Sequence, residues 1–282
     1  MPTTLLSTDT LAVHLDDPAW AVIDTRFDLA RPDWGEAEYR AAHIPGAMYA
    51  HLDRHLSGPK TGRNGRHPLP EAGAFKAQLG RWGVQAGVQV VVYDQADGMY
   101  AARLWWMLRA LGHATVAVLD GGWAKWLREG RAVRSGDESR PAALFSGPGQ
   151  LGGTVTPEQA ARLAEDPAAR LLDARAPQRY RGEAEPIDPV AGHIPGALNY
   201  PYPRSLQPDG TFRPAAEVRA ELEAVLGQTP PGSAATYCGS GVTACHVILA
   251  AEHAGLPGLQ LYPGSWSEWC ADPARPIATG PG

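Results

Sequence analysis

Cysteine is scarce in this sequence of 282 residues. The three cysteines, Cys238, Cys245 and Cys270, do not form the closely spaced, even-numbered pattern of a disulfide framework. Because disulfides mark oxidising compartments, this composition favours a location in the reducing cytoplasm.

An excess of charge of either sign is also lacking. Lysine and arginine together number 25 and aspartate and glutamate 30, which gives a net charge of −5. A protein that binds nucleic acid or an anionic membrane surface usually carries an excess of positive charge. The sequence therefore predicts neither kind of partner.

Long hydrophobic runs are absent as well. No stretch of the sequence is long and apolar enough to span a bilayer. The N-terminal residues Met1–Ser7 contain neither the basic region nor the apolar run of a signal peptide. With 44% hydrophobic and 20% charged residues the chain has the composition of a soluble globular protein, and its length suits two domains.

Apolar runs alternate with segments of helical periodicity in the first half of the chain. Strands are expected at 20–24, 88–93 and 115–119. Helices are expected at 7–15, 36–42, 71–82, 100–111 and 122–129, and the Gly- and Pro-rich segment 51–70 is expected to be a long loop. This alternation predicts an α/β domain in which helices flank a mostly parallel sheet.

The order of these motifs recurs in the second half. The sequence His-Ile-Pro-Gly-Ala occurs at 43–47 and again at 193–197. Further repeated elements are Val22–Arg26 with Leu171–Arg175, and Trp123 and Trp126 with Trp266 and Trp269. A single repeat at about half the chain length indicates two copies of one domain. We place the domains at 1–138 and 153–282, joined by a linker at 139–152.

The two copies differ at one position that bears on chemistry. Tyr237-Cys238 in the second copy corresponds to Tyr93-Asp94 in the first. Because an aspartate cannot act as a thiol nucleophile, the first copy is expected to be catalytically silent. Residues that both copies keep are therefore expected to be structural. They are Asp24, Arg26, His43, Asp173, Arg175, His193 and the four repeated tryptophans.

Cys238 is the candidate nucleophile. It directly follows a short apolar strand, and Gly239–Gly241 then allow a tight loop. Thr243 is a candidate N-cap for the next helix, whose positive end and backbone N–H groups favour an anion and hence the thiolate. The alternative is a buried structural cysteine, which free cysteines often are. The glycines, which allow a bound group to approach the backbone, favour the reactive cysteine.

The residue types of the loop also indicate which kind of anion it binds. Cysteine phosphatases close a similar loop with an arginine six positions after the cysteine, where this chain has Ala244. The loop contains no charged residue, so a doubly charged phosphate would find backbone dipoles and no guanidinium. A sulfur atom carried on the cysteine suits a neutral loop better.

The loop Cys238–Ala244 resembles the active loop of the rhodanese superfamily, most closely that of the 3-mercaptopyruvate sulfurtransferases. The duplicated layout resembles the tandem members of this superfamily. The resemblance implies two rhodanese-like domains and no metal or organic cofactor. It implies that 3-mercaptopyruvate, thiosulfate or both donate a sulfane sulfur to Cys238, and that the resulting persulfide passes it to a thiol, such as that of a thioredoxin-type protein, or to cyanide.

The resemblance also assigns residues that bind the donor. Arg179 matches the substrate-binding arginine of the family, and a guanidinium suits a carboxylate through two parallel hydrogen bonds. Arg181 is a weaker candidate, and a solvated surface arginine is the alternative for both. Ile187 stands where mercaptopyruvate enzymes often have a second arginine. The loop residues expected to bind the donor are Gly239, Gly241, Val242 and Thr243.

A proton relay of Asp53, His67 and Ser240 is the third assignment that follows from the resemblance. His67 lies in a segment similar to one that the mercaptopyruvate group places near the cysteine. Such a relay could move protons as a keto-acid product leaves. The alternative is that His67 is an ordinary surface histidine.

The donor preference and the class of function follow from these assignments. Gly239 and Ser240 lack the basic side chains of thiosulfate-preferring relatives, so 3-mercaptopyruvate is the expected preferred donor, with a margin reduced by Ile187. One alternative is a non-catalytic persulfide carrier or regulatory module. The other is a thiol phosphatase or arsenate reductase, which Ala244 disfavours because it stands in place of the loop arginine of those enzymes. Cys245 is expected to be buried, and a resolving role for Cys270 has no support in the sequence.

Overall fold

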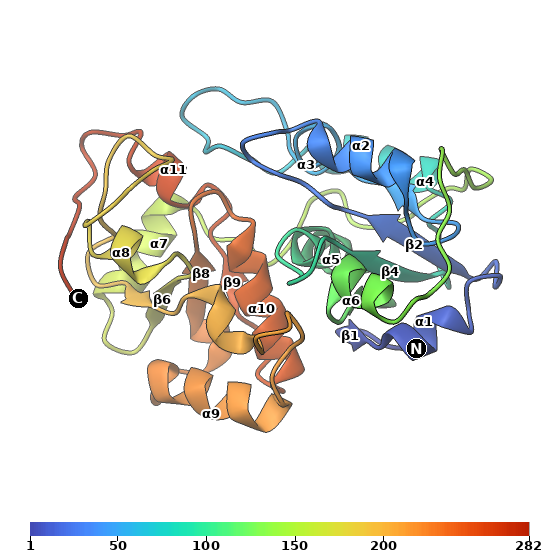
Figure 1. The fold of residues 1–282 in the computed structure, drawn as a ribbon. Helices are drawn as coiled ribbons and strands as arrows, with labels where there is room; N and C mark the ends of the chain where they lie inside the picture. The colour runs from blue at the N-terminus through green and yellow to red at the C-terminus, as the bar shows by residue number, and fades with distance from the viewer. Residues whose placement is uncertain (282) are drawn as a thin grey trace. The chain divides into compact units, whose positions relative to one another are not determined.

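The computed structural model describes residues 1–281, which form two compact units (Figure 1). The first unit comprises Met1–Gly58, Pro70–Gly152 and Gln207–Phe212, and the second comprises Pro59–Leu69, Gly153–Leu206 and Arg213–Gly282. The expected linker at 139–152 thus belongs to the first unit. Each half of the sequence also contributes one segment to the other unit, Pro59–Leu69 to the second and Gln207–Phe212 to the first. The sequence repeat does not predict this exchange, because it does not show against which unit a loop packs.

The first unit is built on a sheet of five strands in which every pairing is parallel. In spatial order the strands are β1 (Leu5–Leu6), β5 (Val116–Leu119), β4 (Gln89–Tyr93), β2 (Trp20–Asp24) and β3 (Met48–Tyr49). Both β2 and β4 are buried along their whole length, as is usual for a strand covered on both faces. The three predicted strands are confirmed, whereas β1 and β3 are too short to show a hydrophobic pattern.

Helices cover both faces of this sheet. They are α1 (Thr8–Ala12), α2 (Trp34–Ala41), α3 (Leu52–His55), α4 (Ala72–Arg81), α5 (Ala101–Ala110) and α6 (Gly122–Arg128). Val91 and Tyr93 of β4 point into one core cluster together with Trp123 and Trp126. Because successive strand residues face opposite sides, Val90 faces the other side, where α5 packs on β4. The predicted packing role of these two tryptophans is therefore confirmed.

Helix α3 corrects the prediction of an uninterrupted loop at 51–70. His51 caps this helix, since its Nδ1 accepts a hydrogen bond from the backbone N–H of Asp53 at 3.1 Å. The glycines and prolines that suggested a loop begin only at Gly58. A helix of four residues is too short to produce a periodic pattern in the sequence.

The second unit repeats this architecture. Its strands, in spatial order, are β7 (Leu198–Asn199), β6 (Arg170–Asp173), β8 (Ala234–Tyr237) and β9 (Gln260–Leu261), all parallel. A parallel bridge between Thr154 and Leu261 lies beside β9, as β1 lies beside β5 in the first unit. The common strand order confirms the duplication and the predicted α/β fold class.

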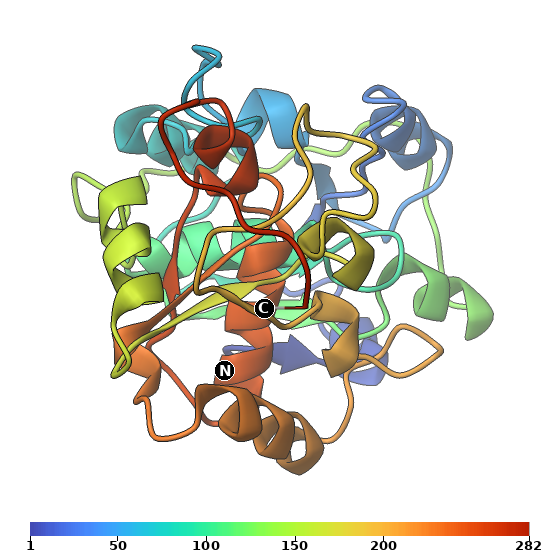
Figure 2. The ribbon, with the colours of Figure 1, turned by 90° about the vertical axis from the view of Figure 1, so that its left-hand side faces the viewer.

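The helices of the second unit also lie on both faces of its sheet (Figure 2). They are α7 (Pro157–Glu165), α8 (Pro177–Tyr180), α9 (Ala215–Leu226), α10 (Thr243–His253) and α11 (Ser265–Trp269), with 3₁₀ turns at Tyr202–Ser205 and Pro231–Ser233. Ala235 and Tyr237 of β8 point into a core cluster with Trp266 and Trp269. Helix α10 packs against β8 and β9, while α7 packs against β6 and β8.

Strand register places Asp94 and Cys238 at equivalent positions. Tyr93 pairs with Asp24 in the first sheet, as Tyr237 pairs with Asp173 in the second. The carbonyl of Asp94 accepts a hydrogen bond from the N–H of Trp123 at 2.9 Å, and that of Cys238 accepts one from Trp266 at 2.9 Å. Each residue therefore begins the loop at the carboxyl end of a central strand, where ligands bind in open α/β sheets.

The arginines repeated in both units are structural, as predicted. Each binds, with its guanidinium, the buried aspartate two residues before it, and its guanidinium carbon lies 4.6 Å from the centre of a tryptophan ring. These groups are Asp24, Arg26 and Trp123 in the first unit, and Asp173, Arg175 and Trp266 in the second. The ion pair and the ring contact together fix the strand end that precedes each loop.

The repeated histidines are structural as well. His43 Nδ1 lies 2.7 Å from the carbonyl oxygen of Tyr39, and His193 Nδ1 lies 2.8 Å from that of Tyr180. Each imidazole also stacks on the ring of the same tyrosine. Both side chains are buried.

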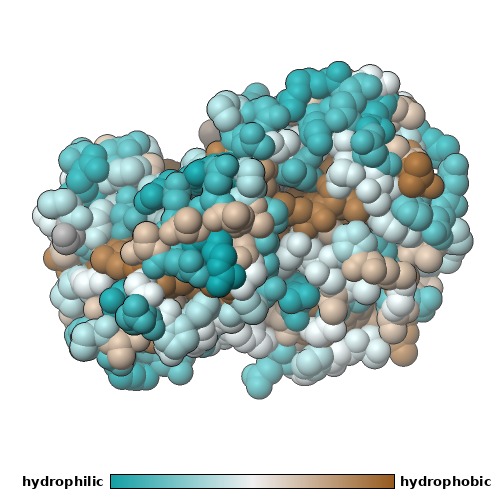
Figure 3. Space-filling model, turned by 90° about the horizontal axis from the view of Figure 1, so that it is seen from below, coloured by the Kyte–Doolittle hydropathy of each residue, from teal (hydrophilic) through white to brown (hydrophobic). Residues whose placement is uncertain are grey.

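No helix within residues 1–281 combines the length and the apolar character that a membrane crossing requires. The face of the molecule seen in Figure 3 is mainly hydrophilic, with hydrophobic residues in smaller patches.

Candidate active site

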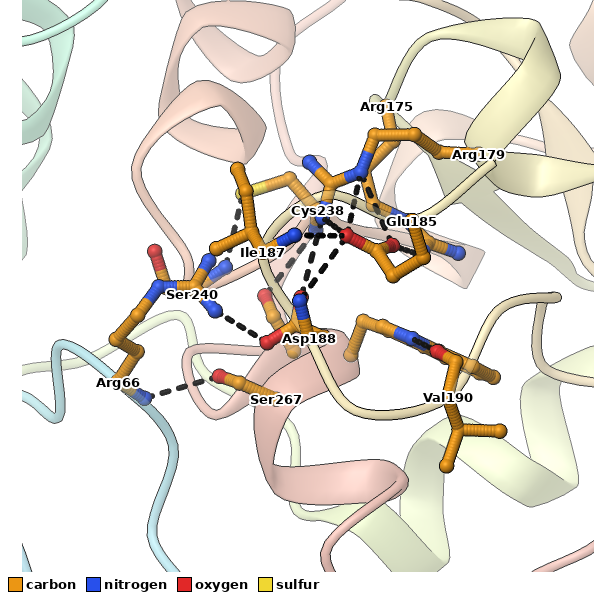
Figure 4. A network of polar contacts seen from close by, with 12 residues as sticks. Arg66, Arg175, Arg179, Glu185, Ile187, Asp188, Val190, Cys238, Ser240 and Ser267 are labelled. Carbon is orange, nitrogen blue, oxygen red and sulfur yellow. Dashed lines mark hydrogen bonds and ion pairs between the residues drawn. The ribbon is translucent and has the colours of Figure 1, made fainter. Parts of the chain in front are cut away.

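Cys238 follows β8 directly, and its side chain lies at the start of the loop that leads into α10. The residue is 2% exposed, and its Sγ accepts a hydrogen bond from the N–H of Ser240 at 3.5 Å (Figure 4). Gly241 has a φ of +75°, a conformation that favours glycine and lets the chain turn sharply into the helix. Thr243 is the first residue of α10, and Val242, already in a helical conformation, precedes it as the cap. The predicted N-cap role of Thr243 is therefore wrong.

Helix α11 holds the backbone of this loop. The N–H of Cys238 donates to Ser265 Oγ at 3.1 Å, and this hydroxyl donates to the carbonyl of Tyr262 at 2.9 Å. The N–H of Ser267 donates to the carbonyl of Gly239 at 2.9 Å. Within residues 1–281, Ser265 is the one residue other than glycine with a positive φ, 56°. Such strain, about 1–2 kcal/mol, is often found at functional sites.

His67 and Ser240 lie together in the second unit. His67 Nδ1 is 2.7 Å from Ser240 Oγ, and both side chains are buried. His67 reaches the loop because the segment Pro59–Leu69 belongs to this unit. Asp53 lies in α3 of the first unit, so its part in a relay stays a prediction.

Arg179 projects from α8 toward the loop. A Cβ atom built on Gly239 would lie 3.6 Å and 3.7 Å from Nη2 and Nη1 of Arg179. Arg179 also donates to Glu185, from Nη2 to Oε1 at 2.6 Å and from Nε to both oxygens at 3.0 Å. Burial raises the pKa of Glu185, but the hydrogen bonds from Arg179 outweigh this effect and leave the pKa below its ordinary value. Glu185 is therefore the fixed carboxylate that orients Arg179.

Arg66 is a second guanidinium beside the loop that the sequence analysis did not select. Its Nη2 would lie 2.8 Å from a Cβ atom on Gly239, and its Nη1 is paired with Asp188. Asp188 also accepts a hydrogen bond from Arg179 Nη2 at 3.1 Å. Burial raises the pKa of Asp188, against the opposing charge of Arg66. The sequence could have pointed to Arg66 through its position directly before His67, which was already a candidate site residue.

Arg181 and Ile187 have hydrogen-bond partners other than the active loop. The guanidinium of Arg181 pairs with exposed Glu183 at 2.7 Å, so the structure gives it a surface partner rather than a place beside Arg179. Ile187 is 45% exposed, and its N–H donates to Glu185 Oε1 at 3.1 Å. Position 187 therefore lies next to the donor-binding candidates but offers no charge.

The remaining cysteines are not suited to take part in thiol chemistry at the loop. Cys245 is buried, as predicted, and its Sγ donates to the carbonyl of Gly241 at 3.2 Å. Burial raises the pKa of Cys270 to about 11, which keeps this thiol protonated near neutral pH. In residues 1–281 the His, Cys, Asp and Glu side chains form no group of three or more that could hold a metal ion.

The equivalent loop of the first unit is closed by its own carboxylate. Asp94 is fully buried. One carboxylate oxygen accepts from the N–H groups of Ala96 and Gly98 at 3.1 and 3.0 Å, and the other from those of Tyr100 and Ala101 at 2.7 and 3.2 Å. In this unit the backbone N–H groups of the loop are thus occupied by a side chain that cannot act as a sulfur nucleophile.

Comparisons with known proteins agree with this geometry. A family model for the rhodanese-like domain matches residues 7–129 and 156–272. The chain is 45% identical over 280 residues to a Pseudomonas aeruginosa protein named "Probable 3-mercaptopyruvate sulfurtransferase", with 98% of both chains covered. It is 36% identical to the thiosulfate sulfurtransferase of Bos taurus over 94% of this chain and 90% of that protein. The solved structure of 3-mercaptopyruvate sulfurtransferase from Leishmania major matches with a TM-score of 0.84 and 32% identity, covering 95% of this chain and 74% of its own.

The chain therefore belongs to the rhodanese-like domain family, as a member with two tandem α/β domains. The relatives are sulfurtransferases, and this chain is an enzyme of the same class. The resemblance, the fold class and the enzyme class predicted from the sequence are thereby confirmed.

Proposed function

We propose that this sulfurtransferase moves a sulfane sulfur from 3-mercaptopyruvate, with thiosulfate as a second donor, through a persulfide on Cys238. The acceptor is a thiol, such as that of a thioredoxin-type protein in a reducing cytoplasm, or cyanide. The observation that carries the proposal is the contact of His67 Nδ1 with Ser240 Oγ at 2.7 Å, two residues after the cysteine. Thiosulfate needs no proton when its sulfur leaves, whereas the carbanion left by 3-mercaptopyruvate does.

In the first half-reaction Arg179 binds the carboxylate of 3-mercaptopyruvate, and the Cys238 thiolate attacks the donor sulfur. A sulfur–sulfur bond forms as the carbon–sulfur bond breaks, and its electron pair passes into the enolate of pyruvate. The Ser240–His67 pair supplies the proton that turns this enolate into pyruvate. The sulfur keeps its own hydrogen or loses it to solvent, so the products are pyruvate and the Cys238 persulfide.

In the second half-reaction the acceptor thiolate attacks the outer sulfur of the persulfide. The sulfur–sulfur bond to Cys238 breaks and its electron pair returns to Sγ, where the N–H of Ser240 donates a hydrogen bond. The acceptor leaves as a persulfide, or as thiocyanate when the acceptor is cyanide. This two-step course predicts ping-pong kinetics.

Steady-state kinetics with both donors test the proposal. We expect multiple turnovers with cyanide and with a reduced thioredoxin-type thiol, and a higher kcat/KM for 3-mercaptopyruvate than for thiosulfate. A single turnover without release of product would instead indicate a persulfide carrier. Hydrolysis of a chromogenic phosphate ester without sulfur transfer would indicate a phosphatase.

The His67→Asn variant is expected to lower kcat with 3-mercaptopyruvate by about 10- to 100-fold while KM changes little. Asparagine can still hydrogen-bond to Ser240, but it has no titrating nitrogen to deliver a proton. Ser240→Ala should have a similar effect, whereas His14→Asn, on the surface of the first unit, should match the wild type. Equal kcat values for His67→Asn and the wild type would show that the contact is structural.

The Asp94→Asn variant is expected to keep turnover within several-fold of the wild type but to lower stability. An amide nitrogen in place of one carboxylate oxygen would point at two backbone N–H donors, which costs about 1–3 kcal/mol. Urea unfolding measures the stability, and turnover with 3-mercaptopyruvate measures the activity. An activity loss as large as that of a Cys238 substitution would show that the first unit takes part in the chemistry.

A further inference from the structure

The second unit contains a cavity of about 400 Å³ that the sulfur transfer does not use. Its walls come from two parts of the chain, the segment Pro59–Leu69 and the residues in and directly after α11. The lining residues are Arg63, Glu268, Ala271, Asp272, Pro273 and Arg275. None of them is Cys238, a residue of its loop or one of the arginines beside that loop, so the cavity is a candidate for a second site.

The wall of this cavity carries two positive and two negative side chains, of which only half are paired. Arg275 pairs with two carboxylates, those of Glu158 at 2.8 Å and Asp272 at 3.4 Å. Among residues 1–281, neither Arg63 nor Glu268 takes part in an ion pair. The cavity therefore presents one unpaired cation and one unpaired anion.

The carboxylate of Glu268 folds back over Gly264. A Cβ atom built on Gly264 would lie 1.8 Å from Glu268 Oε2, so a larger residue there would displace this carboxylate. A Cβ atom on Gly65, whose φ is +82°, would in turn lie 2.6 Å from the carbonyl oxygen of Gly264. Two glycines thus let the segment that carries Arg63 pack directly against the residue beneath Glu268.

Glu268 has less compensation than a partly buried charge needs. Burial raises the pKa of Glu268, and the Tyr262 hydroxyl and the Arg275 guanidinium offset only part of this rise. A cation that entered the cavity would restore the balance, because a buried carboxylate is stable only with a partner. The fold itself does not require an acid here. The equivalent residue of the first unit is Lys125, which pairs with Glu129 at 3.9 Å.

We propose that this cavity binds a free α-amino acid with an uncharged side chain, whose ammonium group pairs with Glu268 and whose carboxylate pairs with Arg63. One zwitterion then satisfies both unpaired charges, whereas a simple anion or cation would satisfy only one. The volume lies in the range of small-molecule sites, and Ala271 and Pro273 offer apolar wall to the side chain of the ligand. The inference goes beyond the proposed function and does not depend on which donor the enzyme prefers.

The elements that carry these two charges are already joined at another point. Glu268 lies on α11, and Ser267 Oγ of the same helix accepts a hydrogen bond from the N–H of Arg66 at 2.9 Å (Figure 4). Arg63 lies three residues before Arg66. A ligand that bridges Arg63 and Glu268 ties the same two elements together once more, so its binding should raise the unfolding temperature.

Calorimetric titration of the full chain with L-leucine tests the proposal. L-leucinamide lacks the carboxylate and N-acetyl-L-leucine lacks the ammonium group, so each should bind about 10-fold more weakly than leucine or worse. Thermal unfolding should show a higher Tm with leucine than with either analogue. Equal binding of all three compounds, or no binding of leucine at millimolar concentrations, would overturn the proposal.

Variants locate the site. Arg63→Ala and Glu268→Gln should each weaken leucine binding about 10- to 100-fold, because one charge-assisted pair is lost. Arg63 is exposed, so its replacement should leave the fold intact even if that of Glu268 does not. Lys60→Ala from the same segment and Glu223→Gln from the exposed face of α9 are the matched controls, and both should bind leucine like the wild type.

A last comparison separates this cavity from the active loop. Leucine should bind equally well to the wild type and to the Cys238→Ser protein, and saturating pyruvate should not displace it. Displacement by pyruvate, or unchanged leucine affinity in Arg63→Ala, would place the amino acid elsewhere and overturn the proposal. The sulfur transfer from 3-mercaptopyruvate is measured independently, so its failure would contradict the proposed function and not this site.

Discussion

Replacing Cys238 by serine is expected to lower sulfur transfer by about a thousandfold or more with either donor, because a hydroxyl cannot form the persulfide. Serine is close to cysteine in size, and its Oγ can accept the hydrogen bond from the N–H of Ser240. The fold should therefore persist, which thermal unfolding can check. Turnover is measured with 3-mercaptopyruvate and with thiosulfate, each with cyanide as acceptor.

Cys245→Ser is the matched control for this experiment. Cys245 is also buried, and its Sγ donates to the carbonyl of Gly241, a bond that a serine hydroxyl can replace. We expect this variant to keep most of the wild-type activity. A Cys238→Ser protein as active as the Cys245→Ser protein would show that another group carries the sulfur.

Replacing Arg179 by alanine is expected to raise KM for both donors, and for 3-mercaptopyruvate by about 10- to 100-fold. The guanidinium lies beside Gly239 and is held there by Glu185. Since a carboxylate anchor binds the ground state and the transition state alike, kcat should change much less. Arg181→Ala should have a smaller effect, because the guanidinium of Arg181 pairs with Glu183 at the surface.

The converse substitution, Ile187→Arg, should widen the preference for 3-mercaptopyruvate over thiosulfate, mostly through KM. The backbone of Ile187 already donates to Glu185, so an arginine here would start next to the Arg179 cluster. The ratio of kcat/KM values for the two donors measures the effect. A wild type that prefers thiosulfate, with the ratio unchanged in Ile187→Arg, would contradict the assignment of the preferred donor.

The fold could be predicted well from the sequence because its signals are local and repeated. The alternation of apolar runs located β2, β4 and β5, and the repeated His-Ile-Pro-Gly-Ala motif revealed the duplication. The central strands pair in the same register in both sheets, so Asp94 and Cys238 occupy equivalent positions in the two units. Strands of two residues and the helix Leu52–His55 escaped prediction, since they are shorter than any hydrophobic period.

The site could be predicted only in part, because its polar groups come from distant segments. Cys238 and its loop form one continuous motif, and His67 and Arg179 follow from the family resemblance. Arg66 and Asp188 meet across 122 positions of the sequence, and no local pattern reports such a pair. The part of Ser265 in the site was not predicted for another reason. This residue adopts a left-handed backbone conformation, which the presence of a serine in the sequence does not reveal.

The central claim is that Cys238 carries the sulfur, and intact-protein mass spectrometry tests it most directly. The protein is incubated with 3-mercaptopyruvate without any acceptor, and peptides are then mapped to locate the adduct. The wild type should gain the mass of one sulfur atom on the peptide that contains Cys238, and should lose it again when cyanide is added. The Cys238→Ser protein should gain nothing. A sulfur adduct on Cys245 or Cys270, or turnover without any adduct on Cys238, would contradict the account.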